Sequence, residues 1–193
     1  MTTNELPLAA AEAAAAPVRY DRVTIAFHWL TALSVVLLFG AAYWWNALPR
    51  IAPLREGLQA FHVSVGILFA AAFVGRILWR WTGGRRLDAA EHGLAGLAAH
   101  AVHAALYVLL GVQIILGFLL RWAEGEEFFF FGLFAIPQVG MPDRAMSRLH
   151  EALHNAVGWT IVYLAAAHAL AALAHHYVLK DGVLRRMLPA ARD

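Results

Sequence analysis

The chain has 193 residues, of which 61% are hydrophobic and 15% are charged, and its mean hydropathy is +0.60. A soluble domain is roughly half apolar and about a quarter charged, so this composition indicates that lipid is the solvent. The chain has no cysteine, which excludes disulfides, cysteine-ligated iron–sulfur clusters and covalently attached c-type haem. Its net charge of +2 comes from basic residues at helix ends rather than on one water-facing surface, so we expect no nucleic-acid partner.

The first 17 residues are rich in alanine, contain Glu5 and Glu12, and include no basic residue. A secretory signal opens with positive charge, so we interpret this segment as a disordered cytoplasmic tail. A single four-helix domain is predicted over residues 18–189, and residues 190–193 are expected to form a short C-terminal tail.

Four apolar runs follow the tail, each bounded by charged residues, glycine or proline. They are predicted as membrane spans at about residues 23–45, 58–80, 98–120 and 149–179. At about 1.5 Å per residue, each is long enough to cross a hydrocarbon layer about 30 Å thick. The expected fold is therefore all-α: an integral membrane four-helix bundle with up-and-down topology.

Basic residues are distributed unequally between the two sides of this bundle. With the N-terminus in the cytoplasm, ten lie on the inner side and five on the outer side, which is the bias that positive-inside topology requires. Both termini are therefore predicted to be cytoplasmic. The inner residues are Arg19, Arg22, Arg76, Arg80, Arg85, Arg86, Lys180, Arg185, Arg186 and Arg192, and the outer ones are Arg50, Arg55, Arg121, Arg144 and Arg148.

The longest outer connection, residues 123–147, combines acidic and aromatic side chains. Glu124, Glu126 and Glu127 precede four consecutive phenylalanines, Phe128 to Phe131. The glutamates put negative charge on the outer face, which opposes the approach of an anionic donor. The phenylalanines are expected either to enter the membrane interface or to cap the bundle, and composition leaves both open.

Four of the ten histidines lie at matched depths within the predicted spans. His154 and His168 are fourteen residues apart, which is close to four turns and about 21 Å, so they share one helix face. Across an antiparallel bundle, His62 comes level with His154 in the outer half, and His28 comes level with His168 in the inner half. Ligand-type side chains at membrane depth are costly and usually functional, so two ligand pairs are predicted.

Paired imidazoles from facing helices suit haem iron, and bis-histidine ligation favours electron transfer. Zinc or copper is less favoured because a third ligand requires His150 or His103. A single membrane histidine can also simply hydrogen-bond a neighbouring helix, but four at matched depths favour ligation. His150 lies one turn before His154 on the same face and remains an alternative outer ligand; His154 is preferred because His150 falls at headgroup level.

Three further side chains are candidates near the inner pair. Arg76 lies fourteen residues after His62, where its guanidinium either pairs with a haem propionate or is an ordinary positive-inside arginine. His103 and His175 lie near the inner ends of the third and fourth spans, either contacting a propionate, delivering protons to a quinone, or serving as interfacial polar residues. His92 is expected in a solvated loop.

Several segments together resemble the bacterial cytochrome b561 family, and their order and spacing are specific. They cover nearly the whole chain beyond the tail. The segments are RYDRVTIAFHWL at 19–30, HVSVG at 62–66, FFGLF at 130–134 followed by Pro137, HEALH at 150–154, and His168 with HHYVLKDGVLRRMLP at 175–189.

This resemblance implies a di-haem quinone oxidoreductase of the bacterial inner membrane. It assigns His28 and His168 to one haem b, and His62 and His154 to the other. It also implies ubiquinone as the acceptor and an outer donor such as superoxide or another periplasmic redox partner. Two rival hypotheses are a haem b membrane-anchor subunit of a larger dehydrogenase or hydrogenase, and a haem-free transporter or structural bundle whose histidines move protons or metal.

Overall fold

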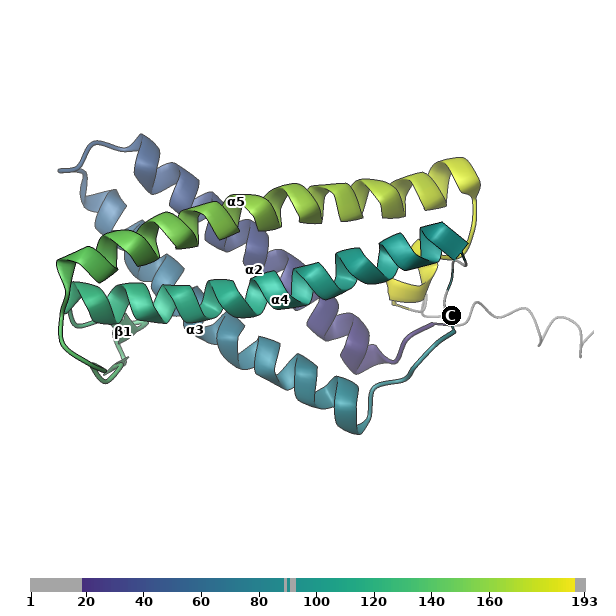
Figure 1. Ribbon diagram of the computed structural model, residues 1–193, viewed down its shortest axis with the longest axis horizontal. Helices are drawn as coiled ribbons and strands as arrows, with labels where there is room; N and C mark the ends of the chain where they lie inside the picture. The colour runs from purple at the N-terminus through teal and green to yellow at the C-terminus, as the bar shows by residue number, and fades with distance from the viewer. Residues whose placement is uncertain (1–18, 89, 91–92, 190–193) are drawn as a thin grey trace, which may run out of the picture.

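The computed structural model describes residues 19–88, 90 and 93–189. It contains four long helices, α2 (Arg22–Ala47), α3 (Pro53–Thr82), α4 (Gly93–Glu124) and α5 (Arg144–Ala174) (Figure 1). A π-helical turn, η1 (His175–Leu179), continues α5, so the last apolar span runs from Arg144 to Leu179. All four are long and apolar enough to cross a membrane, which confirms the expected helical membrane bundle. The expectations for residues 1–17, His92 and residues 190–193 lie outside the described residues.

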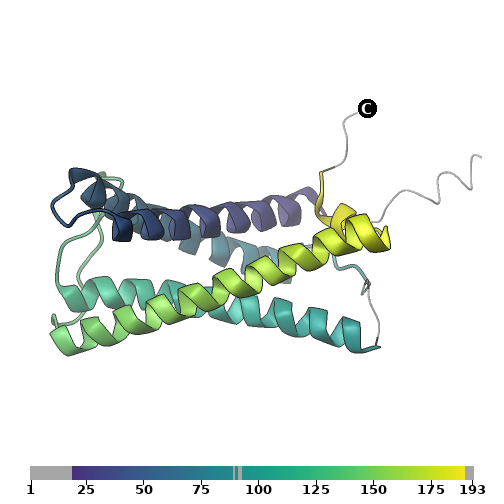
Figure 2. The same ribbon diagram turned by 90° about the horizontal axis from the view of Figure 1, so that it is seen from above.

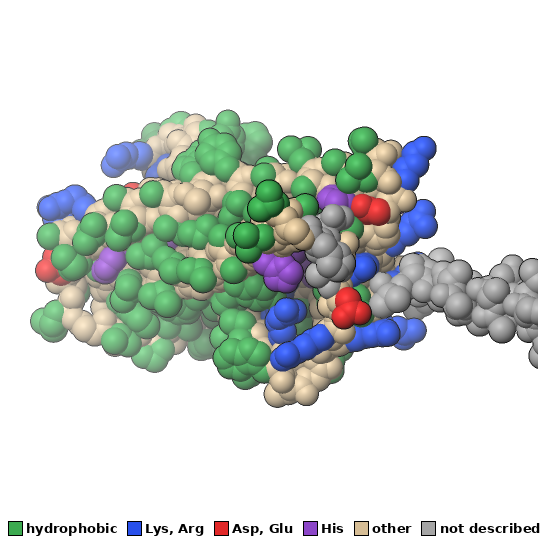
Figure 3. Space-filling view, turned by 45° about the vertical axis from the view of Figure 1, so that its right-hand side comes forward, with side chains coloured by type: hydrophobic (Ala, Val, Ile, Leu, Met, Phe, Trp, Pro, Cys, Tyr) green, Lys and Arg blue, Asp and Glu red, His purple; other side chains and the backbone are tan. Residues whose placement is uncertain are grey.

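The helices run up and down as two hairpins (Figures 1 and 2). α2 packs along α3 and α4 packs along α5, whereas α2 meets α5, and α3 meets α4, over only a few residues. Hydrophobic side chains cover much of the flank in Figure 3, and arginine and lysine side chains gather toward the two ends. This distribution suits a bundle whose sides face lipid and whose ends face water.

The helices extend beyond the predicted membrane spans, mainly at their N-terminal ends. α3, α4 and α5 begin at Pro53, Gly93 and Arg144, each five residues before the predicted start. The first turns of α3 and α5 contain Pro53, Arg55, Glu56 and Arg144, which do not continue the apolar runs from which the spans were predicted. Proline at the first helical position is compatible with helix, and polar side chains extend a helix past the hydrocarbon layer. Hydropathy therefore marks the membrane thickness and not the helix length.

The centre of the bundle is a small apolar core. Phe69 and Phe73 of α3, Leu110 of α4 and Ile161 of α5 are each at most 8% exposed and form one cluster. Partly buried residues of all four helices, including Val35 of α2, pack around it. The core thus joins the two hairpins at mid-depth.

The connection between α4 and α5, on the side predicted to be outer, contains a short β-hairpin that packs on the bundle. β1 (Phe129–Phe130) pairs antiparallel with β2 (Phe134–Ala135). The hydroxyl of Ser64 on α3 accepts a hydrogen bond from the N–H of Phe131 at 2.9 Å and donates one to the carbonyl of Phe129 at 3.3 Å. Of the two expectations for the phenylalanines, the structure therefore shows contact with the bundle, although Phe129 remains 44% exposed.

The two ends of the described chain, on the side predicted to be inner, are tied together by hydrogen bonds. Lys180 has a left-handed φ of 55° and ends the last span, after which η2 (Leu184–Met187) turns back toward α2. The indole N–H of Trp29 donates to the carbonyl of Met187 at 2.8 Å, and the N–H of Tyr20 donates to the carbonyl of Arg186 at 3.1 Å. The two ends of the described chain consequently lie on the same side of the bundle.

Candidate functional site

The outer histidine pair joins α3 to α5. The rings of His62 and His154 have centroids 6.2 Å apart and an interplanar angle of 67°. Nδ1 of His62 lies 2.9 Å from the carbonyl oxygen of Leu38 on α2, and the ring of Trp45 packs at 4.9 Å. Because a carbonyl oxygen only accepts, Nδ1 of His62 carries the proton, which leaves the lone pair on Nε2.

His154 is the histidine of α5 that lies against His62, and α4 approaches it closely. A Cβ atom built on Gly117 would lie 3.4 Å from Cε1 of His154. Even the smallest side chain at position 117 would therefore touch the imidazole. The structure thus brings together the two histidines that were predicted as the outer pair, and His150 is not the ring that meets His62.

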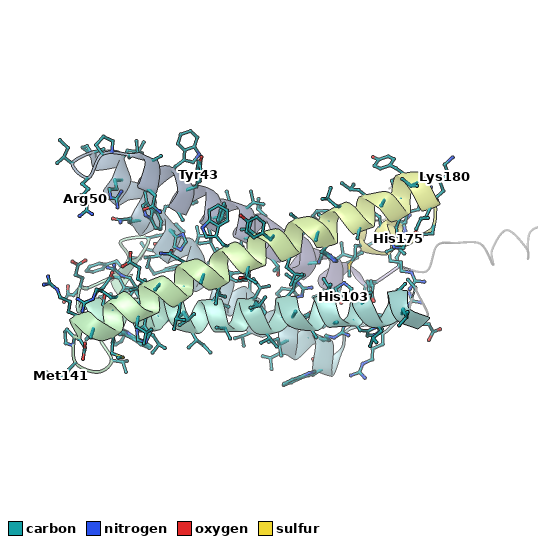
Figure 4. The ribbon with its side chains drawn as sticks, turned by 45° about the horizontal axis from the view of Figure 1, so that its top comes forward. Tyr43, Arg50, His103, Met141, His175 and Lys180 are labelled. Carbon is teal, nitrogen blue, oxygen red and sulfur yellow. The ribbon has the colours of Figure 1, made fainter. Side chains whose placement is uncertain are left out.

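The inner histidine pair joins α2 to α5. The rings of His28 and His168 have centroids 6.4 Å apart and an interplanar angle of 74°. His103 of α4 lies beside the same site, with its ring centroid 5.1 Å from that of His168. The inner level therefore holds three imidazoles from three helices. Figure 4 shows His103 near the end of the bundle that carries His175 and Lys180, opposite Arg50 and Met141.

Arg76 enters the inner level from α3 and cross-links three helices. Its Nε donates to the hydroxyl of Tyr107 on α4 at 2.9 Å, and its Nη1 donates to the hydroxyl of Thr31 on α2 at 3.0 Å. The guanidinium carbon lies 5.0 Å from the centre of the Tyr107 ring, within range of a cation–π interaction.

The apolar core separates the two histidine levels. Ile161 lies seven residues from both His154 and His168, which places it about halfway between them on α5. Phe69 and Phe73 occupy the same interval on α3, between His62 and Arg76. The site therefore consists of two polar levels with hydrocarbon between them.

His175 lies beyond the inner level, at the start of η1. Its Nδ1 is 2.5 Å from the carboxylate of Asp181, and this hydrogen bond lowers the pKa of the Asp181 carboxyl below its ordinary value. The pair holds the chain reversal that follows α5. His100, nearer the same end of α4, donates from Nδ1 to the carbonyl of Gly96 in its own helix at 2.8 Å.

Several neighbours of the histidines were not predicted. Tyr107 lies four residues after His103, so helical periodicity could have placed it on the same face. Thr31 lies three residues after His28 in the same way. The carbonyl of Leu38 left no sequence signal, because every non-terminal residue has one.

Among the described residues, no three His, Cys, Asp or Glu side chains gather in a group able to hold a metal ion by themselves. What the fold provides is opposed imidazole pairs at two depths of a membrane bundle, an arrangement characteristic of b-type membrane cytochromes. The family comparison agrees: the model of the prokaryotic cytochrome b561 family matches residues 19–190, so this chain belongs to that family. It is a multi-pass membrane cytochrome that takes part in electron transfer.

Three relatives illustrate the similarity. Cytochrome b561 homolog 2 of Escherichia coli (strain K12) is 35% identical, over 89% of this chain and 92% of the relative. The probable superoxide oxidase CybB of Yersinia pestis is 29% identical, over 90% of this chain and 98% of the relative. Cytochrome b561 homolog 1 of E. coli is 27% identical, over 89% and 97%. The similarity to a superoxide oxidase supports an oxidoreductase.

Proposed function

We propose that this protein holds two b-type haems by bis-histidine ligation and carries electrons across the bacterial inner membrane to ubiquinone. His62 and His154 are the ligands at the outer level, and His28 and His168 are the ligands at the inner level. The observation that carries the proposal is the spacing of the opposed rings, 6.2 Å in the outer pair and 6.4 Å in the inner pair.

This spacing suits a single metal ion between each pair. A histidine nitrogen binds a transition metal at about 2 Å, and the ring centre lies roughly 1 Å further out, so two rings on opposite sides of one ion have centroids about 6 Å apart. Each pair supplies two ligands, which leaves the remaining positions of the iron to a porphyrin.

Haem iron, when bound, supplies one-electron redox chemistry, and bis-histidine ligation leaves it no open position. The role of the chain is to hold the haems and to orient their histidine ligands. The hydrogen bond from His62 to Leu38 keeps the Nε2 lone pair directed away from α2, which is the arrangement expected of a metal-binding histidine. The apolar core between the levels excludes water from the path between them.

Arg76, His103 and His175 belong to the inner end of the path in this proposal. His103 lies beside the inner pair and is suited to contact a propionate oxygen there. Arg76 lies at the same level, where its Nε and Nη1 already donate to Tyr107 and Thr31. His175, held by Asp181, stands nearer to cytoplasmic water and is suited to supply protons for quinone reduction.

The outer donor is proposed to be superoxide, by analogy with the Yersinia pestis relative. The outer acidic cluster is partly neutralised, because Arg121 pairs with Glu124 at 2.5 Å and with Glu126 at 3.6 Å. The repulsion that the sequence suggested for an anionic donor is reduced accordingly.

Haem analysis of the purified full-length protein tests the ligand assignment. We expect two haem b per chain and a reduced spectrum of a low-spin cytochrome. Replacement of His154 or His168 by alanine should each remove one haem, whereas replacement of His150 should remove none. A wild-type protein with well under two haems would contradict the assignment.

The donor and acceptor need a separate assay. We expect the isolated protein to be reduced by enzymatically generated superoxide and reoxidised by a soluble ubiquinone, with superoxide dismutase abolishing the reduction. Normal haem content without reduction by superoxide would reject this donor. Co-purification with an iron–sulfur subunit would then favour the membrane-anchor alternative.

The orientation is proposed from the excess of arginine at the end where the described termini meet. The chain has no cysteine, so single cysteines introduced at Ser147 and Asp88 report on opposite ends. In intact cells, a membrane-impermeant thiol reagent should label the first and spare the second.

A further inference from the structure

We infer that Arg76 sets the direction of electron flow, by raising the reduction potential of the inner haem site above that of the outer one. This inference rests on the proposed function, since it presupposes haem at both histidine levels. It concerns one side chain that the ligation scheme does not use. The three observations that support it are the placement of Arg76, the neutrality of its partners, and the contrast with the outer level.

Arg76 is half-buried at the inner level and is held there by hydrogen bonds. Hydrogen bonds to Tyr107 at 2.9 Å and Thr31 at 3.0 Å fix the guanidinium between α2, α3 and α4. Both bonds are donated by the guanidinium to hydroxyl groups, so they position its charge without cancelling it. Arginine keeps its proton even in an apolar environment, so the charge is permanent.

The partners of Arg76 are neutral. The ion pairs found among the described residues involve Arg121 with Glu124 and Glu126, and His175 with Asp181, all away from Arg76. Reduction of a metal site adds one electron and so makes the site one unit more negative. A fixed positive charge nearby stabilises the reduced form, and it does so more strongly in a bundle interior than in water.

Among the described residues, the outer pair has no neighbour equivalent to Arg76. The neighbours described for the outer pair include the Leu38 carbonyl, the Trp45 ring and Gly117, none of which is charged. Arg121, one turn after Gly117 on α4, is paired with Glu124. The arginine of α3 nearest in sequence is Arg55, seven residues and about 10 Å along the helix toward outer water. Its guanidinium donates to the Trp45 carbonyl at the end of α2.

These differences make the inner site the better electron acceptor of the two. An electron delivered at the outer side then moves downhill toward the cytoplasmic side. The direction is set by the position of one arginine along α3, while the histidine ligands are alike at both levels.

Redox titration of the purified full-length protein, followed by haem absorbance, tests this role. The wild type should show two one-electron components, and the one removed by His28→Ala is the inner one. We expect Arg76→Gln to lower the midpoint potential of the inner component and leave the outer one in place. Arg76→Lys keeps the charge but cannot make both hydrogen bonds, so it should retain most of the inner potential.

A matched pair of variants at Thr31 separates charge from packing without altering Arg76. Thr31→Asp places a carboxylate against the guanidinium. Thr31→Asn introduces a side chain of nearly the same shape as aspartate but without its charge. The aspartate should lower the inner potential and the asparagine should leave it close to wild type. Arg55→Gln makes the same arginine-to-glutamine change at the outer end of α3. It should not shift the midpoint potential of the inner component.

Three outcomes would overturn the inference. The first is an unchanged inner potential in Arg76→Gln or Thr31→Asp with both haems bound, which leaves the ligand assignment intact. The second is an equal fall of the inner midpoint potential in Arg76→Lys and Arg76→Gln, which would show that this potential depends on the hydrogen bonds and not on the charge. The third is a wild type that binds fewer than two haems, which removes the proposed function and the role of Arg76 together.

Discussion

The imidazole of His62 on α3 donates its Nδ1 proton to the backbone carbonyl of Leu38 on α2, at 2.9 Å. The acceptor is a main-chain atom of a helix, so its position depends on the fold of α2 and not on the side chain at position 38. The orientation of a proposed ligand is thereby built into the packing of the first hairpin. Substitution of Leu38 by another apolar residue should leave the ring orientation unchanged.

The choice between the two outer histidines of α5 gives the first prediction. His154→Ala should reduce the haem content from two to one per chain, because its ring is the one opposed to His62. His150→Ala is the matched control one turn away and should retain two haems. Quantitative haem extraction measures both, and equal losses in the two variants would contradict the pairing.

Gly117 gives a second prediction about the same pair. An alanine Cβ there meets Cε1 of His154 at 3.4 Å, which is ordinary contact, so Gly117→Ala should keep both haems. The two extra methyl groups of Gly117→Val have no such room and should push the ring away from His62. We expect that variant to lose the outer haem and keep the inner one, as seen in the absorbance spectrum. Retention of both haems in Gly117→Val would show that α4 does not constrain the ring.

Ser64 anchors the β-hairpin formed by β1 and β2, and removal of its hydroxyl should loosen this β-hairpin. It is only 2% exposed, and its hydroxyl bonds the backbone of Phe129 and Phe131. Ser64→Ala leaves the Phe131 N–H without its acceptor, which costs about 1–3 kcal/mol. Limited proteolysis should then cut residues 125–142 faster than in wild type. Thr82→Ala, which removes a hydroxyl bonded only within its own helix, should leave the cutting rate unchanged.

Asp21 should make stability depend on pH in the acidic range. Burial by itself raises the pKa of this carboxyl, but hydrogen bonds from the Thr24 hydroxyl and N–H, the Arg85 N–H and the Trp79 indole outweigh it and hold the pKa far below its ordinary value. A carboxyl with a depressed pKa stabilises the fold above its unfolded pKa of about 4, and that contribution falls away as the pH drops.

The test of Asp21 is thermal unfolding in detergent at several pH values. Asp21→Ala removes the cap of α2 and should lower stability by about 1–2 kcal/mol at pH 7. The difference between wild type and the variant should shrink as the pH falls below about 4. Asp21→Asn can still cap the helix, so its stability should lie between that of the wild type and that of Asp21→Ala. A difference that stays constant with pH would show that the carboxylate charge contributes nothing.

The four spans and the depths of the histidines could be predicted from the sequence alone. A membrane acts on each segment separately, so hydropathy over about 20 residues identifies a span without knowledge of its neighbours. The constant rise of the helix then converts the spacing of His154 and His168 into depth, and the antiparallel order matches them with His62 and His28. The family resemblance rests on the same residues.

Other features depend on how the helices rotate and approach one another, which hydropathy does not encode. Packing decides that His154 and not His150 meets His62, that Arg76 is held by Tyr107 and Thr31, and that the outer hairpin lies on Ser64. These contacts join residues from 31 to 92 positions apart, so no local pattern reports them. Depth is a property of a single helix, whereas the partner of a side chain at that depth is a property of the assembled bundle.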